Sequence, residues 1–407
     1  MAAGCGRAAA KQSAPNAATP VAQLSPGPTN SSSPGSSGSG ASPKPGQPSA
    51  SPSHGSSPPA GGGTPSSSPS NTAPATPPPA SPSPTPAGTV RSGGINAEPA
   101  MRPWRYAGPN PDGWWCVAPN CYQNANPMTT VDAELAAAHA LNVADVRLEF
   151  PWPLIEPTRG GFDWTRADAI VSAARSHGVV LQPVLVYTPS WAAASATSAP
   201  APADWSAFVT AFMQHYGSTF PVIEMWNEPD SGQAAHYWSA GDQAYVTDIL
   251  IPGYAAVKAV SPGVLVEMGA PSCATCGFLD SIYQDGGGNS FDIASYHDYG
   301  SDPVAAALFT HNTLLSHGQG GKPIWLGEYG VQENSVSDPQ QQALVTAGLT
   351  EAGYPAMAQF YNLRDDNSMT CCPGAVAVAA YWGLVQHDDA TRKTGFGVMQ
   401  GLLGGSG

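Results

Sequence analysis

The stretch Val179-Val-Leu-Gln-Pro-Val-Leu-Val-Tyr187 decides the fold class when it is read with the segments that follow it. It is a short apolar run rich in β-branched residues, which is typical of a strand buried on both faces. A helical pattern follows over Ala203–Tyr216, and a second apolar run follows over Val222–Trp226. Strand, helix and strand in this order form the unit of a parallel sheet. The sequence therefore predicts an α/β fold.

The same alternation extends on both sides of this unit. The other predicted strands are Asp145–Phe150, Val264–Met268, Phe291–Ser295, Pro323–Gly327 and Ala356–Leu363. The other predicted helices are Val131–Leu141, Trp164–His177, Asp242–Ala259, Cys276–Gln284, Val304–His317, Gln340–Ala352 and one after Thr394. A first strand is needed before Val131, and Trp104–Ala107 or Gly113–Val117 could supply it. Eight such repeats predict a (β/α)8 TIM barrel. A doubly wound sheet is the alternative, but no Gly-x-Gly-x-x-Gly follows the first strands.

The barrel is predicted over residues 101–407, behind a long tether. Residues 1–100 contain 21 of the 43 prolines and no Phe, Trp or Tyr. A chain of Pro, Ser, Gly, Ala and Thr cannot bury a hydrophobic core. We therefore expect residues 1–100 to be a disordered tether and all the chemistry to lie after it.

Composition excludes several partners. Charged residues make up only 11% of the chain, Lys and Arg total 15, and the formal net charge is −14. The basic patches that bind nucleic acid are therefore missing. No run approaches the ~18 apolar residues that a membrane-spanning helix needs. We expect a monomer that binds neither nucleic acid nor any cofactor.

Six of the seven cysteines occur in close pairs, Cys116/Cys121, Cys273/Cys276 and Cys371/Cys372. Local pairing into disulfides is the simplest arrangement, and it implies an exported, oxidising location. Pairing of Cys371 or Cys372 with Cys273 or Cys276 is an alternative, because a bridge between adjacent cysteines is strained. A four-cysteine zinc site is a further alternative, although adjacent cysteines lack the usual two-residue spacing.

The remaining cysteine, Cys5, stands in Met-Ala-Ala-Gly-Cys-Gly. Ala-Gly-Cys is similar to the cleavage box of bacterial lipoproteins, in which the cysteine is lipidated. The charged and apolar segments that precede such a box are absent. Membrane anchoring through Cys5 and a chance cysteine in a low-complexity tail both stay open. The expected location is secreted or anchored at the outer surface of a membrane.

Carboxylates and aromatic residues gather at the predicted strand ends, where the βα loops of a barrel build its active site. Glu228 follows the fourth predicted strand and Glu328 the seventh. Glycoside hydrolysis requires two such carboxyl groups, one to protonate the leaving oxygen and one to act at the anomeric carbon. Aromatic rings beside carboxylates suit sugars, and Trp152 and Trp191 are candidate stacking platforms, with core packing as the alternative reading.

Two motifs carry a specific resemblance. Trp226-Asn-Glu-Pro-Asp230 resembles the acid/base motif of the clan A retaining glycosidases, and Trp325-Leu-Gly-Glu-Tyr-Gly330 resembles the nucleophile strand of that clan. Families 39 and 5 are the most similar members. The resemblance implies that Glu228 is the acid/base, with a raised pKa, and that Glu328 is the nucleophile. It further implies substrate-site roles for the following residues: Arg147, Asn227, His297, Tyr299 and Trp382.

The function that the resemblance implies is a retaining glycoside hydrolase, which needs neither a metal nor an organic cofactor. A domain on a long tether suits a polysaccharide substrate and endo action. The family 39 architecture is incomplete here, because little chain follows the eighth repeat. Three alternatives stay open: an exo-acting xylosidase-like enzyme, an inactive barrel that binds glycan at a surface, and a zinc-dependent hydrolase.

Overall fold

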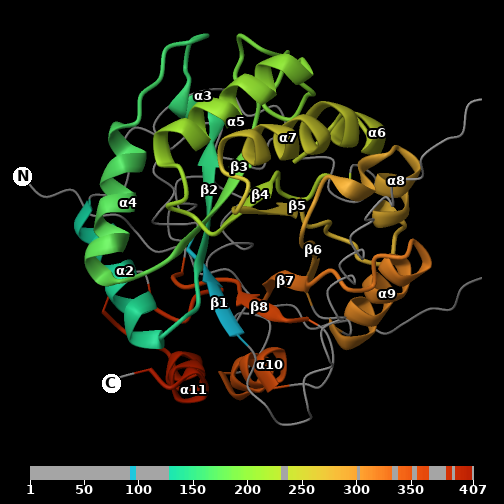
Figure 1. Ribbon diagram of the computed structural model, residues 1–407. Coiled ribbons are helices and arrows are strands. Elements are labelled where there is room, and N and C mark those ends of the chain that lie inside the picture. The colour runs from blue at the N-terminus through green and yellow to red at the C-terminus, as the bar shows by residue number, and fades with distance from the viewer. Residues whose placement is uncertain are drawn as a thin grey trace, which may run out of the picture. The chain divides into compact units, whose positions relative to one another are not determined.

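Eight parallel strands and the helices that connect them form the described part of the chain (Figure 1). The computed structural model describes residues 92–97, 128–230, 237–299, 303–331, 338–350, 355–365, 382–386 and 390–405. All of these residues belong to one compact unit, Ala75–Gly407. No helix within them is long and apolar enough to cross a membrane.

The strands close into a barrel. They are β1 Ser92–Asn96, β2 Val146–Pro151, β3 Leu181–Val186, β4 Val222–Met225, β5 Leu265–Met268, β6 Ala294–Asp298, β7 Ile324–Tyr329 and β8 Met357–Phe360. The ladder runs β5-β4-β3-β2-β1-β8-β7-β6. A parallel bridge between Glu267 and Ile293, extended by the bond from Met268 N to Ile293 O, joins β5 to the start of β6. The predicted TIM barrel is confirmed.

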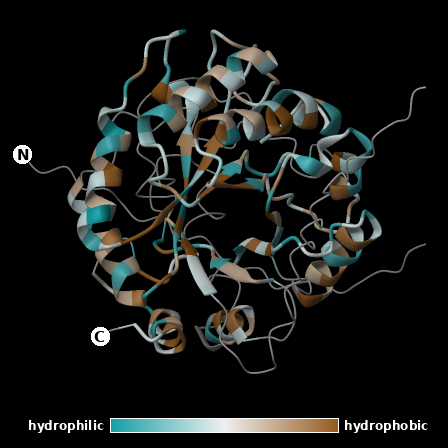
Figure 2. Cartoon of the chain, in the orientation of Figure 1, coloured by the Kyte–Doolittle hydropathy of each residue, from teal (hydrophilic) through white to brown (hydrophobic). Residues whose placement is uncertain are grey.

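The helices lie around the barrel (Figure 1). They are α2 Met128–Leu141, α3 Trp152–Ile155, α4 Thr165–His177, α5 Pro202–Tyr216, α6 Asp242–Tyr245, η1 Val246–Leu250, α7 Ile251–Val260, α8 Phe278–Gln284, η2 Gly287–Asn289, α9 Pro303–Ser316, α10 Asp338–Thr350 and α11 Thr394–Leu403. The predicted helix Asp242–Ala259 is thus a continuous run of α6, η1 and α7. Apolar residues concentrate on the strands and on the inner sides of the helices (Figure 2), as burial of apolar surface requires.

The first strand lies before the predicted positions. β1 is Ser92–Asn96, inside the stretch assigned to the tether, so the boundary at residue 100 is wrong. The candidates Trp104–Ala107 and Gly113–Val117 fall outside the described residues. Ser-Gly-Gly-Ile-Asn contains only one β-branched residue, so local propensity gave no strand signal. Pairing with β2 and β8 makes this segment a strand instead.

A glycine in β1 makes room for polar groups inside the barrel. A Cβ atom on Gly94 would lie 2.3 Å from Oδ1 of Asp145 and 2.7 Å from Cγ of Gln359. The Nε2 atom of Gln359 donates to Asp145 at 2.8 Å and also to Oε1 of Gln182. Glu267 accepts from Gln182, and all four side chains are buried. These four side chains form a buried polar cluster inside the barrel, which is called the barrel floor below. Residue 94 must be glycine because a side chain there would collide with this cluster.

One predicted disulfide is present. Cys273 and Cys276 are bonded, with their Cα atoms 5.5 Å apart. This pairing excludes bonds from either residue to Cys371 or Cys372. The other two predicted pairs lie outside the described residues.

Candidate active site

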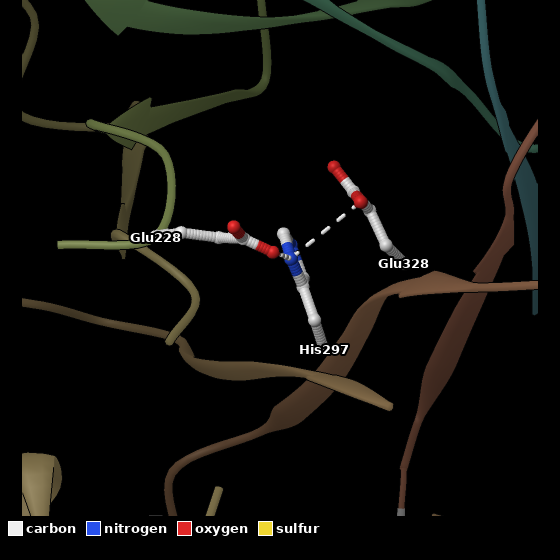
Figure 3. Close-up of side chains that lie close together, drawn as sticks. All are labelled: Glu228, His297 and Glu328. Carbon is white, nitrogen blue, oxygen red and sulfur yellow. Dashed lines mark hydrogen bonds and ion pairs between the residues drawn. The ribbon is translucent and has the colours of Figure 1, made fainter. Parts of the chain in front are cut away.

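Two glutamates and a histidine meet at the carboxyl ends of the strands. Glu328 lies within β7, His297 lies within β6, and the two residues are partners in the β6–β7 register. Glu228 lies three residues beyond the end of β4. Figure 3 shows the imidazole of His297 between the two carboxyl groups, with interactions to both. Strand ends far apart in sequence thus deliver three titratable groups to one point, as the barrel prediction required.

The turn that carries Glu228 has an unusual backbone. Trp226 has φ 79° and Glu228 has φ 43°, a left-handed region that non-glycine residues seldom adopt. The indole of Trp226 is fully buried, donates from Nε1 to the carbonyl of Tyr237 at 2.9 Å, and packs on Trp238. The Glu228 amide donates to Ala270 O at 3.1 Å. Such conformations persist when the surrounding structure over-determines them, and they cluster at functional sites.

Arg147, on β2, is the buried cation of the site. Its Nε and Nη2 atoms bond Glu224 at 2.6 and 3.0 Å, and its Nη1 atom bonds Glu328 at 2.6 Å. Nη2 also donates to Oδ1 of Asn227 at 2.8 Å. A fully buried charge must be paired, and the planar guanidinium can bond several acceptors at once. Arg147 therefore fixes Glu328 and Asn227 relative to the β4 strand.

His297 links the two candidate catalytic groups. Its Nδ1 atom lies 2.9 Å from Oε1 of Glu228 and 3.6 Å from Oε2 of Glu328. Burial alone lowers the pKa of His297, but the negative charge of Glu328 and the hydrogen bond to Glu228 outweigh it, so its pKa is raised above the ordinary value. The imidazole of His297 therefore stays protonated up to a higher pH than a free histidine does.

Aromatic side chains border Glu328. The Tyr299 hydroxyl donates to Oε2 of Glu328, while 42% of the residue is exposed. Removal of that hydroxyl from water, together with the charge of Glu328, raises the pKa of Tyr299 well above its usual value, so the hydroxyl stays protonated and donating. The ring of Tyr299 lies 5.1 Å from Trp382 and 6.0 Å from Tyr361 between centroids. Tyr299 thus contacts Glu328 directly, and Tyr361 and Trp382 pack against the ring of Tyr299.

Residues 191–383 match the family model described as glycosyl hydrolase catalytic core. The matched segment contains Glu228, His297, Glu328 and Trp382. The match covers slightly less than half of the chain, from before β4 to beyond β8. No curated protein shows a significant match to the sequence.

Solved structures of glycosidases share the fold of this chain. A family 39 glycoside hydrolase from Bacteroides cellulosilyticus WH2 is 15% identical with a TM-score of 0.54, over 77% of this chain and 63% of that chain. A family 39 β-xylosidase from Caulobacter crescentus is 17% identical with a TM-score of 0.59, over 79% and 73%. The exo-β-1,4-mannosidase Op5Man5 from Opitutaceae bacterium strain TAV5 is 16% identical with a TM-score of 0.55, over 78% and 60%. The chain thus spans less than two thirds of two of these three proteins.

One predicted sugar contact, Trp152, is wrong. Trp152 is fully buried, stacks on Phe208 with centroids 5.1 Å apart, and donates to Glu156 at 2.7 Å, so it is a core residue. Trp191 is partly buried. Its indole nitrogen donates to Glu156 O, its ring edge meets Trp152, and the Arg159 guanidinium lies 4.6 Å over the ring. A sugar contact by Trp191 stays a prediction.

Sequence reasoning missed two residues of the site. Asn96 donates from Nδ2 to Gly327 O at 2.9 Å and accepts from Arg147 at 3.0 Å, which ties β1 to β7 and to the arginine on β2. It was overlooked because it lies in the stretch assigned to the tether. Tyr361 directly follows β8, and its ring meets both Tyr299 and Trp382. Its position at a strand end was a usable signal.

The three central groups could also be considered as metal ligands. Glu228, His297 and Glu328 each offer one ligand atom, and these atoms lie within 4.8 Å of one another. One histidine and two carboxylates are an acceptable ligand set for a divalent ion. The Arg147 guanidinium, however, already bonds Glu328, and its charge opposes a cation there. Among the described residues, this arrangement fits acid–base and nucleophilic chemistry better than metal binding.

Proposed function

We propose that this chain hydrolyses O-glycosidic bonds with retention of configuration, using Glu328 as the nucleophile and Glu228 as the acid/base. The spacing of the two groups carries the proposal. One oxygen of Glu228 and one of Glu328 lie within 4.8 Å of each other. Retaining enzymes hold the two carboxyl groups ~5–5.5 Å apart, whereas inverting enzymes need ~6.5–9.5 Å to admit water. A separation of 4.8 Å or less fits the close pair of a retaining enzyme and falls short of the separation that inverting enzymes need.

The surrounding groups support these two roles. Arg147 and the Tyr299 hydroxyl both bond Glu328, which fixes the orientation of the carboxylate that would attack the anomeric carbon. Glu228 would protonate the leaving oxygen while Glu328 attacks the anomeric carbon, giving a glycosyl-enzyme intermediate. Glu228 would then take a proton from the water that hydrolyses this intermediate. Asn227, held by Arg147 through its Oδ1 atom, can donate from Nδ2 to the sugar 2-hydroxyl.

The substrate class is a further part of the proposal. Endo action on an extracellular polysaccharide is supported by the Pro- and Ser-rich sequence of residues 1–91, which suits a domain that reaches a polymer. Exo action is supported by the names of two structural neighbours, a β-xylosidase and an exo-β-1,4-mannosidase. An exported location is supported by the Cys273–Cys276 disulfide, and anchoring through Cys5 is proposed from its sequence context.

A product screen tests the proposal. We would incubate the full-length protein with xylans, mannans, β-glucans, galactans and arabinans and follow the released sugars by mass spectrometry. Wild type should release sugars from one polymer, and Glu328→Gln should release none while its thermal unfolding is unchanged. Glu228→Gln should lose activity toward poor leaving groups and keep the first step with activated aryl glycosides. Asp280→Asn, a half-exposed carboxylate on α8, is the matched control and should keep full activity.

Full activity of Glu328→Gln would overturn the assignment. Release of oligosaccharides indicates endo action, and release of monosaccharide or disaccharide alone indicates exo action. Binding to one glycan with no product from any polymer would support a binding-only barrel instead.

A further inference from the structure

A loop after β5 lies between the two strand ends that carry Glu228 and His297. This loop, Gly269–Cys276, is called the strap below. Its Ala270 carbonyl accepts from the Glu228 amide at 3.1 Å, and its Pro271 carbonyl accepts from the His297 amide at 2.9 Å. The strap therefore bonds the backbone of both the acid/base and the histidine that contacts it. A displacement of the strap would move both groups.

Asp230 fixes the strap on the side of Glu228. Its Oδ1 atom accepts from the Ser272 amide at 2.9 Å, and its Oδ2 atom accepts from Ser272 Oγ at 2.8 Å and from the Cys273 amide at 3.1 Å. Asp230 is only 4% exposed, and these three donors offset part of the cost of burying its charge. It stands two residues after Glu228, within the same turn. The turn that carries Glu228 is thus joined to the strap in two ways. The Glu228 amide bonds the Ala270 carbonyl, and the buried carboxylate of Asp230 bonds Ser272 and Cys273.

Two features hold the strap in this position. A Cβ atom on Gly269 would lie 2.7 Å from Met225 O and 2.9 Å from Trp226 O, so the strap can approach the end of β4 only because residue 269 is glycine. At its other end, the disulfide between Cys273 and Cys276 closes a turn that also contains the Cys276 N to Cys273 O bond at 3.3 Å. Cys276 is exposed, so a reductant can reach the bond.

We propose that Asp230 is a positioning residue, which holds Glu228 and His297 in register through a strap that the Cys273–Cys276 disulfide keeps closed. This rests on the proposed role of Glu228 as acid/base. The strap bonds the backbone of Glu228 and His297 directly, whereas Glu328 accepts hydrogen bonds from Arg147 and Tyr299, neither of which belongs to the strap. Loss of the Asp230 bonds should therefore impair proton delivery more than nucleophilic attack. Reduction of the disulfide by a dithiol breaks the S–S bond, gives two thiols on the strap and oxidises the dithiol to its own disulfide.

Leaving-group dependence tests the role of Asp230. We would compare kcat/KM of wild type, Asp230→Asn and Asp280→Asn on 2,4-dinitrophenyl and 4-methoxyphenyl glycosides, using the β-xyloside, β-mannoside and β-glucoside series in turn. Dinitrophenolate leaves without a proton, so only the methoxyphenyl substrate needs the acid. Asp230→Asn should lose about tenfold to a hundredfold on the methoxyphenyl substrate and less than about threefold on the dinitrophenyl substrate. Asp280→Asn should match wild type on both.

Several outcomes would overturn the proposal. Equal losses on both substrates indicate a structural role only, and no loss on either removes the role entirely. If Asp230→Asn unfolds, Ser272→Ala removes one donor and leaves both backbone bonds, and it should show a smaller loss with the same leaving-group selectivity. Glu228→Gln is measured alongside to separate the two proposals. If Glu228→Gln keeps wild-type kcat/KM on the methoxyphenyl substrate, Glu228 is not the acid/base. If Glu228→Gln shows the selective loss and Asp230→Asn does not, only the positioning role of Asp230 is refuted.

The disulfide is tested by the double variant Cys273→Ser/Cys276→Ser. It should show the same selective loss as Asp230→Asn, and dithiothreitol should lower wild-type kcat/KM on the methoxyphenyl substrate toward the value of the double variant. Dithiothreitol should have no further selective effect on the double variant. Full kcat/KM in the double variant would show that Asp230 holds the strap without the disulfide and would overturn that part of the proposal.

Discussion

Nη1 of Arg147 lies 2.6 Å from Oε1 of Glu328, and both side chains are buried at the carboxyl end of the barrel. The same guanidinium bonds Glu224 through two other nitrogens. One cation therefore compensates two buried carboxylates and orients the one that faces the substrate. This relationship makes Arg147 as important for the geometry of the site as for its charge.

Replacement of Arg147 by lysine should nearly abolish activity. A single ammonium cannot bond Glu224, Asn227 and Glu328 together, so Glu328 loses its fixed position. We expect kcat/KM to fall by about 10²-fold or more, because a misplacement of about 1 Å can cost that much. Steady-state kinetics and thermal unfolding would measure the effect. Arg175→Lys, at an exposed arginine whose guanidinium bonds the Thr219 hydroxyl, is the control and should change neither quantity. Wild-type kinetics in Arg147→Lys would refute the orienting role.

Removal of the Tyr299 hydroxyl should slow the reaction without unfolding the protein. A hydrogen bond to a charged group contributes about 1.5–3 kcal/mol, which corresponds to about tenfold to a hundredfold in rate. Tyr299→Phe should therefore lose that much in kcat/KM and unfold at an unchanged temperature, because the ring is partly exposed. Tyr283→Phe removes a hydroxyl that bonds only Gln319 among its described contacts, and its kinetics should match wild type. An equal loss in both variants would argue against a specific contact with Glu328.

The buried cluster on the barrel floor predicts a pH-dependent stability. Burial raises the pKa of Asp145 from 3.8 to about 6, despite the hydrogen bond from Gln359. Between about pH 4 and pH 6 the folded state holds a proton that the unfolded chain has released. Ionisation of Asp145 therefore lowers the free energy of unfolding as the pH rises through this window. The loss is complete above the pKa that Asp145 has in the folded protein. A shift of this size corresponds to up to about 3 kcal/mol.

Asp145→Asn should remove this cost, since its amide oxygen can still accept from Gln359. The variant should unfold at a higher temperature than wild type at pH 8 and show a smaller difference between pH 4.5 and pH 8. Thermal unfolding across this pH range checks the expectation. Asp285→Asn, at the residue that follows α8, is the control and should follow the wild-type curve. A parallel shift of the Asp145→Asn curve at all pH values would mean that Asp145 is ionised throughout.

Two truncations should separate the tether from the barrel. Removal of residues 1–90 leaves β1 intact, and this shortened chain should fold and act on soluble substrate as the full chain does. Removal of residues 1–98 deletes β1, which pairs with β2 and β8 and supplies Asn96. That chain should fail to fold or lose activity. Circular dichroism and kinetics on a soluble glycoside would compare them. Equal activity of the two truncations would show that β1 is dispensable.

Much of the fold was predictable because the pattern is local. The apolar runs at Val222–Met225 and Leu181–Val186 and the helical periods between them need only side-chain hydropathy to be recognised. Glu228 and Glu328 could be singled out because each follows or ends a strand, and all strand ends of a parallel barrel meet on one side. The Cys273–Cys276 pair was predictable from its spacing alone.

The tertiary structure decided what depends on partners distant in sequence. Ser92–Asn96 has no strand propensity of its own, and it is a strand because β2 and β8 satisfy its backbone hydrogen bonds. Trp152 has the neighbours of a sugar platform, but Phe208 covers it in the core. The distance between Glu228 and Glu328, on which the proposed retaining mechanism rests, is set by strand register and by Arg147. The sequence by itself determined which residues we propose as catalytic, because residue type and local pattern are properties of the chain. Only the closed barrel decided their separation, because it is the barrel that joins strands a hundred residues apart.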